Sequence, residues 1–237
     1  MAGILMIALG LTGLGYWIYQ QPSLAVEAAH DDLLDSAQIL QPSIEAVLAV
    51  DTAAAGSDVS EQLVLINADA RSLFNVAGAL PTTLNDERSI AADIAGQALE
   101  GSRILNDAYA YRSAVLPILV VPDFETDPAL ITLDDAAATF GLWQTHFQDV
   151  IAALPAGMMN ELEGELTLIS ANLEVLKTRY LDALRTDNPG GVAIVVHELN
   201  TSLADAEMLF HVEFDEMSTI AQAQFIKALE SINLLFG

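Results

Sequence analysis

The sequence predicts an all-α protein, in which an N-terminal transmembrane helix precedes an elongated antiparallel bundle of about six helices. Three observations lead to this prediction. Apolar residues recur at alternating spacings of four and three along most of the chain, which is the heptad pattern of coiled-coil-like packing. Short breaks separate the periodic segments, as is typical of antiparallel bundles. Residues 1–26 carry no charged side chain.

The composition excludes several classes of function. The chain has 237 residues, with 8 Lys and Arg against 33 Asp and Glu, so its formal net charge is −25. Hydrophobic residues make up 53% of the sequence, which excludes intrinsic disorder for most of the chain. Nucleic-acid binding is excluded because it needs clustered basic residues, and this charge would repel a polyanion. Without Cys, the chain forms neither disulfides nor thiolate metal sites.

Residues 1–21 are predicted to form a membrane anchor that contacts lipid. About 19 apolar residues at roughly 1.5 Å each give about 28 Å, close to the thickness of the bilayer core. Tyr16, Trp17 and Tyr19 are the candidate residues at the membrane–water interface, where aromatic side chains gather. Acidic residues follow the anchor, which favours an extracytoplasmic location of the soluble part, either periplasmic or at the cell surface.

Two other interpretations of this apolar segment remain open. It could be a cleaved signal peptide, although the basic residues that usually begin one are missing. It could also form the core of a filament, in which the apolar helices of many copies bury one another.

Residues 22–116 are predicted to form the first helical half, with three helices. The first helix should bend at Pro42, which lacks a backbone N–H group. Asp58 and Glu61 match a capping box at the start of the second. The third should run from about Thr83 to Leu116. Its predicted buried stripe is rich in small residues, which favour close helix packing: Ala91, Ile94, Ala95, Ala98, Ser102 and Leu105.

Residues 117–131 are predicted to be a Pro-rich link, and residues 132–237 the second helical half, again with three helices. Thr132 and Asp135 match a capping box. The run Asn188-Pro189-Gly190-Gly191 is predicted to break the chain before a last helix from about Val192 to Phe236. Two β-branched runs, residues 116–121 and 192–196, leave a small two-stranded patch open.

Residues with metal-binding or catalytic potential are sparse. Glu27 and His30 are weak candidate metal ligands because their i, i+3 spacing places them on one helix face. A dinuclear site in a bundle needs a second such pair and two further carboxylates, and no second Glu-x-x-His element occurs. Nucleophile and phosphate-binding motifs are also missing. We therefore expect no metal, no cofactor and no enzyme activity.

The expected function is that of a non-enzymatic, membrane-anchored extracytoplasmic bundle, which acts as a structural, accessory or scaffold subunit of an envelope protein complex. Protein partners or self-association would use helix faces that stay apolar after the bundle closes. One alternative is a filament or surface-layer subunit that polymerises through residues 1–21. Another is a ligand-binding or sensor-like bundle, by analogy of fold alone. A metal-dependent enzyme that uses Glu27 and His30 is the remaining alternative.

Overall fold

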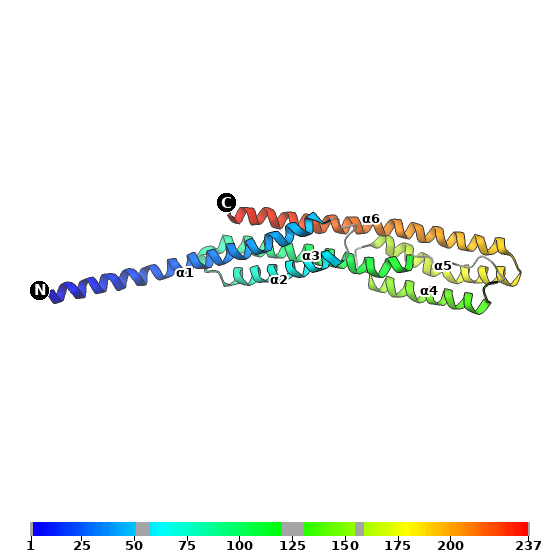
Figure 1. The fold of residues 1–237 in the computed structure, drawn as a ribbon, viewed down its shortest axis with the longest axis horizontal. Helices are drawn as coiled ribbons and strands as arrows, with labels where there is room; N and C mark the ends of the chain where they lie inside the picture. The colour runs from blue at the N-terminus through cyan, green and yellow to red at the C-terminus, as the bar shows by residue number, and fades with distance from the viewer. Residues whose placement is uncertain (1, 51–56, 120–129, 155–158, 237) are drawn as a thin grey trace. The chain divides into compact units, whose positions relative to one another are not determined.

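The computed structural model describes residues 2–50, 57–119, 130–154 and 159–236 (Figure 1). Within these ranges it contains six α-helices, one 3-10 turn and no strand, so the all-α prediction is confirmed. The elements are α1 (Ala2–Ala49), α2 (Ser57–Ala79), the 3-10 turn η1 (Thr82–Leu84), α3 (Asn85–Leu119), α4 (Leu133–Ala153), α5 (Asn160–Arg185) and α6 (Pro189–Phe236).

Several predicted helix ends were wrong, chiefly at prolines. Pro22 lies inside α1, so the apolar N-terminal run and the first bundle helix form one continuous helix. Pro42 also lies inside α1, and the bend expected there stays a prediction. Pro117 does not stop α3, which continues to Leu119. One missing N–H group removes a single helical hydrogen bond, and the apolar stripe of α1 is buried on both sides of Pro42.

The open two-stranded patch is excluded for the described residues. Val192–Val196 belongs to α6, and residues 116–119 belong to α3. Here the helical periodicity of the flanking residues outweighs the β propensity of a short branched run. Most of the predicted Pro-rich link, residues 120–129, lies outside the described residues.

The chain divides into two compact units. The first is Met1–Ile104 with Ile220–Gly237, and the second is Leu105–Thr219. Each unit therefore contains four helices or parts of helices among the described residues, since α3 and α6 contribute to both. These limits differ from the halves predicted at 22–116 and 132–237, which stay a prediction.

The first unit is held by apolar stripes and by a close approach of α3 to α6. In α1, α2 and α3 every predicted stripe residue from Leu33 to Ser102 is buried. A Cβ atom added at Gly101 would lie 2.9 Å from Cε1 of Phe225 and 3.0 Å from the carbonyl oxygen of Ala221. The absence of a side chain at this position lets the two backbones meet.

Polar groups inside the first unit bond across helices. Asn67 Nδ2 on α2 donates to the buried Ser102 Oγ on α3 over 2.6 Å, and Ser102 Oγ lies 3.4 Å from the Leu63 carbonyl oxygen, to which it donates. Between α1 and α2, Ser43 Oγ donates to Asp69 Oδ2 over 3.1 Å. Such bonds favour one register of the helices, because a shifted register would leave buried polar groups without partners.

Aromatic side chains dominate the core of the second unit. The apolar face predicted for α4 by its heptad spacing is buried from Ala136 to Val150, whereas its first residue, Leu133, is 39% exposed. The Phe140 ring packs against Tyr180 of α5 with centroids 5.6 Å apart. Tyr109 of α3 meets Phe214 of α6 edge-on, also at 5.6 Å. In α6 the buried residue is Val195 rather than the predicted Val196. Away from the helix ends, the heptad stripes of α4, α5 and α6 are otherwise buried.

Backbone hydrogen bonds close the turn between α5 and α6. The N–H groups of Asp187 and Asn188 donate to the carbonyls of Leu184 and Ala183, the pattern of a Schellman motif, with Asp187 left-handed at φ 51°. Asn188 Oδ1 then accepts from the Gly191 N–H over 3.0 Å and so caps α6. Helix α6 therefore starts at Pro189, three residues before the predicted start.

The predicted helix caps had different outcomes. At α4 the capping box is confirmed, because the Thr132 Oγ1 accepts from the Asp135 N–H over 3.1 Å. Helix α2 begins at Ser57, so Asp58 lies inside the helix and not at the position before it.

Candidate functional site

A groove of about 610 Å³ lies between α5 and α6 in the second unit. Its α5 side carries Leu168 and Val175, which are 59% and 57% exposed. Buried apolar residues of both helices contribute to its lining, and polar residues of α6 complete it: Ile169, Leu176, Leu199, Thr201 and Ser202. We call Leu168 and Val175 the apolar wall of the groove; charged and polar side chains of both helices line the rest of it: Glu165, Asn172, Arg179, His197 and Glu198.

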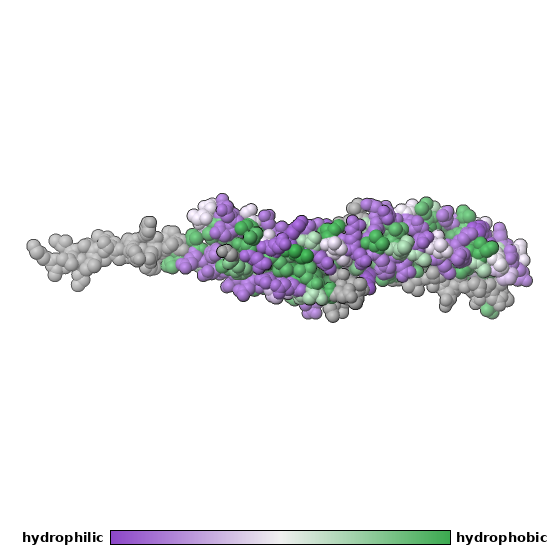
Figure 2. Space-filling model, turned by 90° about the horizontal axis from the view of Figure 1, so that it is seen from above, coloured by the Kyte–Doolittle hydropathy of each residue, from purple (hydrophilic) through white to green (hydrophobic). Residues whose placement is uncertain are grey.

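The apolar wall is a second heptad position on α5, outside the stripe that builds the core. Leu168 and Val175 are seven residues apart, which corresponds to two helical turns and about 10.5 Å along the axis. Figure 2 shows that hydrophobic side chains also reach the surface elsewhere among hydrophilic ones. Both side chains of this pair line one groove.

A bidentate ion pair at the groove joins its two helices. Arg179 Nη1 and Nη2 donate to Glu198 Oε2 and Oε1 over 2.5 and 2.9 Å. Hydrogen bonding from the guanidinium, with its positive charge, lowers the pKa of the Glu198 carboxyl group from its ordinary value. The pair is about half exposed, so its contribution to stability is small.

Glu213 of α6 binds the N-terminus of α5. Its Oε1 accepts from the Glu161 N–H over 2.9 Å, and its Oε2 accepts from the Leu162 N–H over 3.2 Å. The residue before α5, Met159, is left-handed and supplies no side-chain cap, so a carboxylate from another helix satisfies these free N–H groups. Sequence analysis missed this role because the partners are more than 50 residues apart.

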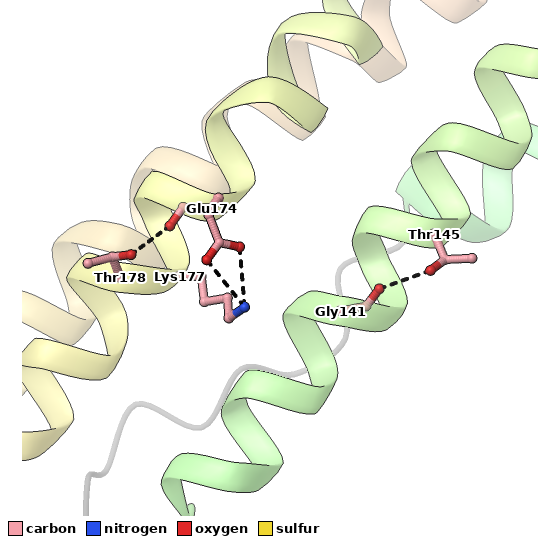
Figure 3. A network of polar contacts seen from close by, with 5 residues as sticks. All are labelled: Gly141, Thr145, Glu174, Lys177 and Thr178. Carbon is pink, nitrogen blue, oxygen red and sulfur yellow. Dashed lines mark hydrogen bonds and ion pairs between the residues drawn. The ribbon is translucent and has the colours of Figure 1, made fainter.

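The α5–α6 pair is strongly acidic. Residues 160–219 contain twelve Asp and Glu against three Lys and Arg. Each of the three bases is ion-paired within the pair of helices: Lys177 with Glu174, Arg179 with Glu198, and Arg185 with Asp182. Figure 3 shows the Glu174–Lys177 contact beside the hydroxyl of Thr178, which donates to the Glu174 carbonyl. Residues 160–219 therefore carry excess negative charge, and their three bases are neutralised by ion pairs.

The predicted candidate site residues all lie on α1. In the described part of the chain, no group of three or more His, Asp or Glu side chains is placed to hold a metal ion, and this includes the surroundings of Glu27 and His30. The backbone of Tyr16, Trp17 and Tyr19 is helical in α1, but their side chains lie outside the described residues. Sequence analysis missed the groove, whose signal was the second pair of apolar residues seven apart on α5.

The membrane anchor stays a prediction. Among the residues whose side chains the structure describes, which begin at Leu24 in α1, no single helix has both the length and the apolar composition to cross a bilayer. The bent pair of segments Val59–Ala79 and Thr82–Leu116, at 120° to each other, meets those two criteria only when its members are taken together.

Comparisons of the chain with protein-family models, with curated proteins and with solved structures find no match.

Proposed function

We propose that this protein acts by contact, as a membrane-anchored, extracytoplasmic scaffold or accessory subunit of an envelope protein complex. The observation that carries the proposal is the exposed apolar pair Leu168 and Val175 in the α5–α6 groove. Large apolar side chains that stay in water after the helices have packed favour burial against a partner. The uncharged N-terminal run would hold this surface at a membrane.

Purification from native membranes tests the scaffold role. The full chain, with an affinity tag at its C-terminus, is extracted in a mild detergent and sized by gel filtration with light scattering. We expect a stoichiometric protein partner that is lost with Leu168→Asp. A monomer without a partner would refute the proposal.

Membrane attachment has its own test. Deletion of residues 2–21 should move the chain from the membrane fraction to the soluble fraction. A full-length chain that is already soluble without detergent would contradict the anchor. High-order polymers of the full chain that disappear on the same deletion would instead favour the filament or surface-layer subunit.

A ligand-binding bundle is a second candidate, and the groove volume favours it. About 610 Å³ falls within the range of about 300–1,000 Å³ that is typical of small-molecule sites. Native mass spectrometry of the purified chain would show a bound small molecule as a fixed mass increment. Loss of that increment in Leu168→Asp would assign the molecule to the groove.

A further inference from the structure

We infer that the α5–α6 groove binds an amphipathic helix whose polar face carries Lys and Arg, supplied by a partner protein. The inference rests on the proposed contact function and specifies the chemistry of the partner. It follows from the spacing of the apolar wall, the charge around it, and the exclusion of other occupants by charge.

The apolar wall has the spacing that a helix recognises. A helix lying along α5 presents apolar side chains at positions i, i+3, i+4 and i+7. Leu168 and Val175 repeat at that seven-residue interval, and Asn172 lies between them in the groove. From Glu165 to Arg179, the groove-lining part of α5 spans about 21 Å, which is the length of about four helical turns.

The charge around the groove selects a basic partner. Residues 160–219, which hold α5 and the part of α6 in the second unit, carry twelve acidic and three basic side chains, and each of these three bases is ion-paired with an acid of the same segment. Glu165 lies in the groove itself. Lys and Arg flanking the apolar stripe of an incoming helix would meet these carboxylates, which raises the association rate and rejects acidic partners.

Other occupants are disfavoured by the same charge. A second copy of the chain, with a net charge of −25, would place acidic surfaces against each other. The segments of this chain outside the described residues contain no Lys or Arg, and residues 120–129 contain three acids, so they lack the complementary charge. Anionic lipid headgroups are repelled for the same reason.

A designed peptide provides the probe. It has about 21 residues, with Leu at the heptad a and d positions and Lys at the flanking positions, so its helix covers the length of the groove. The full chain is held in phosphatidylcholine nanodiscs, and empty nanodiscs measure any binding to lipid. Fluorescence polarisation of the labelled peptide gives the dissociation constant, and hydrogen exchange locates the site.

The decisive comparison is between Leu168→Asp and Leu142→Asp. Leu142 lies on α4 and is 63% exposed, so both substitutions replace an exposed leucine and add one negative charge. We expect Leu168→Asp to weaken binding about tenfold or more, because a central apolar anchor is lost. Leu142→Asp should change it less than about twofold. Val175→Asp is the second groove variant, which is used if Leu168→Asp fails to fold by circular dichroism.

Four outcomes would overturn the inference. These are equal losses in the groove and control variants, equal binding of a scrambled peptide, equal binding of a peptide with Glu in place of Lys, and protection from exchange outside α5 and α6. The proposed function is judged separately. If a stoichiometric partner still co-purifies with Leu168→Asp, the contact function stands and the groove is not its site. If no partner co-purifies with the wild type, the contact function itself fails.

Discussion

The close approach of α3 to α6 at Gly101 can be tested with a single methyl group. Carbon atoms normally lie about 3.5–4.0 Å apart in contact. The methyl group of Gly101→Ala would instead lie 2.9 Å from Cε1 of Phe225 and 3.0 Å from the Ala221 carbonyl oxygen. The backbone oxygen belongs to α6 itself, so the helix must move as well as the ring.

Two opposing terms set the magnitude. Replacing Gly by Ala in a helix interior gains about 1 kcal/mol of helix propensity. Overpacking a tight contact costs about 1–3 kcal/mol. Gly101→Ala should therefore be neutral to destabilising, by up to about 2 kcal/mol. Gly96→Ala is the matched control on the same helix, because no atom lies within 4 Å of its added Cβ. It should stabilise the protein by about 1 kcal/mol.

Thermal and urea unfolding of the full chain, followed by circular dichroism at 222 nm, measures the difference. A gap of about 2 kcal/mol between the two variants corresponds to roughly 4–8 °C in Tm for a protein of this size. Adding Phe225→Leu to Gly101→Ala should recover part of the loss relative to the sum of the single effects. If Gly101→Ala is as stabilising as Gly96→Ala, α3 and α6 do not approach as closely as the structure shows.

Three further substitutions test the helix ends and the groove. Asp187→Gly should raise the free energy of unfolding by about 0.5–1 kcal/mol, because glycine adopts the left-handed φ of 51° without strain, and urea unfolding would contradict this by showing a loss. Glu213→Ala should cost about 1 kcal/mol by freeing the N–H groups of α5, whereas the exposed Glu216→Ala should cost less than half as much. For Arg179→Gln the expected loss of stability depends on pH. The folded-state pKa of Glu198 is lowered, so the stabilisation by this pair is present above the unfolded-state pKa of about 4.3 and disappears as pH falls through the folded-state value. The difference in unfolding midpoint between wild type and Arg179→Gln should thus be greatest near pH 7 and shrink as pH falls below the unfolded-state pKa of about 4.3, and a difference that grows on acidification would contradict the assignment.

Sequence analysis was most successful where one helix carries a regular apolar stripe. The runs in α2 and α5 each follow the 4-3 spacing without interruption, and every predicted residue is buried. It was least successful at prolines. Pro22 and Pro117, which were expected at helix ends, are inside helices, and Pro189, which was expected in a break, starts one. Proline removes one helical hydrogen bond, but burial of the neighbouring turns can stabilise the helix in spite of that loss. The residues next to a proline in the sequence do not reveal this burial.

The candidate site was largely outside the reach of sequence analysis. Leu168 and Val175 were visible as apolar residues off the main stripe, but nothing in the sequence showed that α6 lies beside them. Arg179 and Glu198 are 19 residues apart, and Glu213 is 51 and 52 residues from the groups that it caps. Interactions of this kind have no local spacing, so only the packing of the helices reveals them.

The sequence by itself determined that this chain is helical, where each apolar stripe lies, and that the body of the protein is strongly negative. Periodicity can be seen within a single segment of the sequence, and net charge is a sum over the residues, so neither depends on how the helices pack. The tertiary structure alone decided which residues meet across helices: Gly101 with Phe225, Glu213 with the start of α5, and the groove between α5 and α6. Such contacts depend on the order and register in which helices pack, and many arrangements of the same stripes would bury similar apolar area.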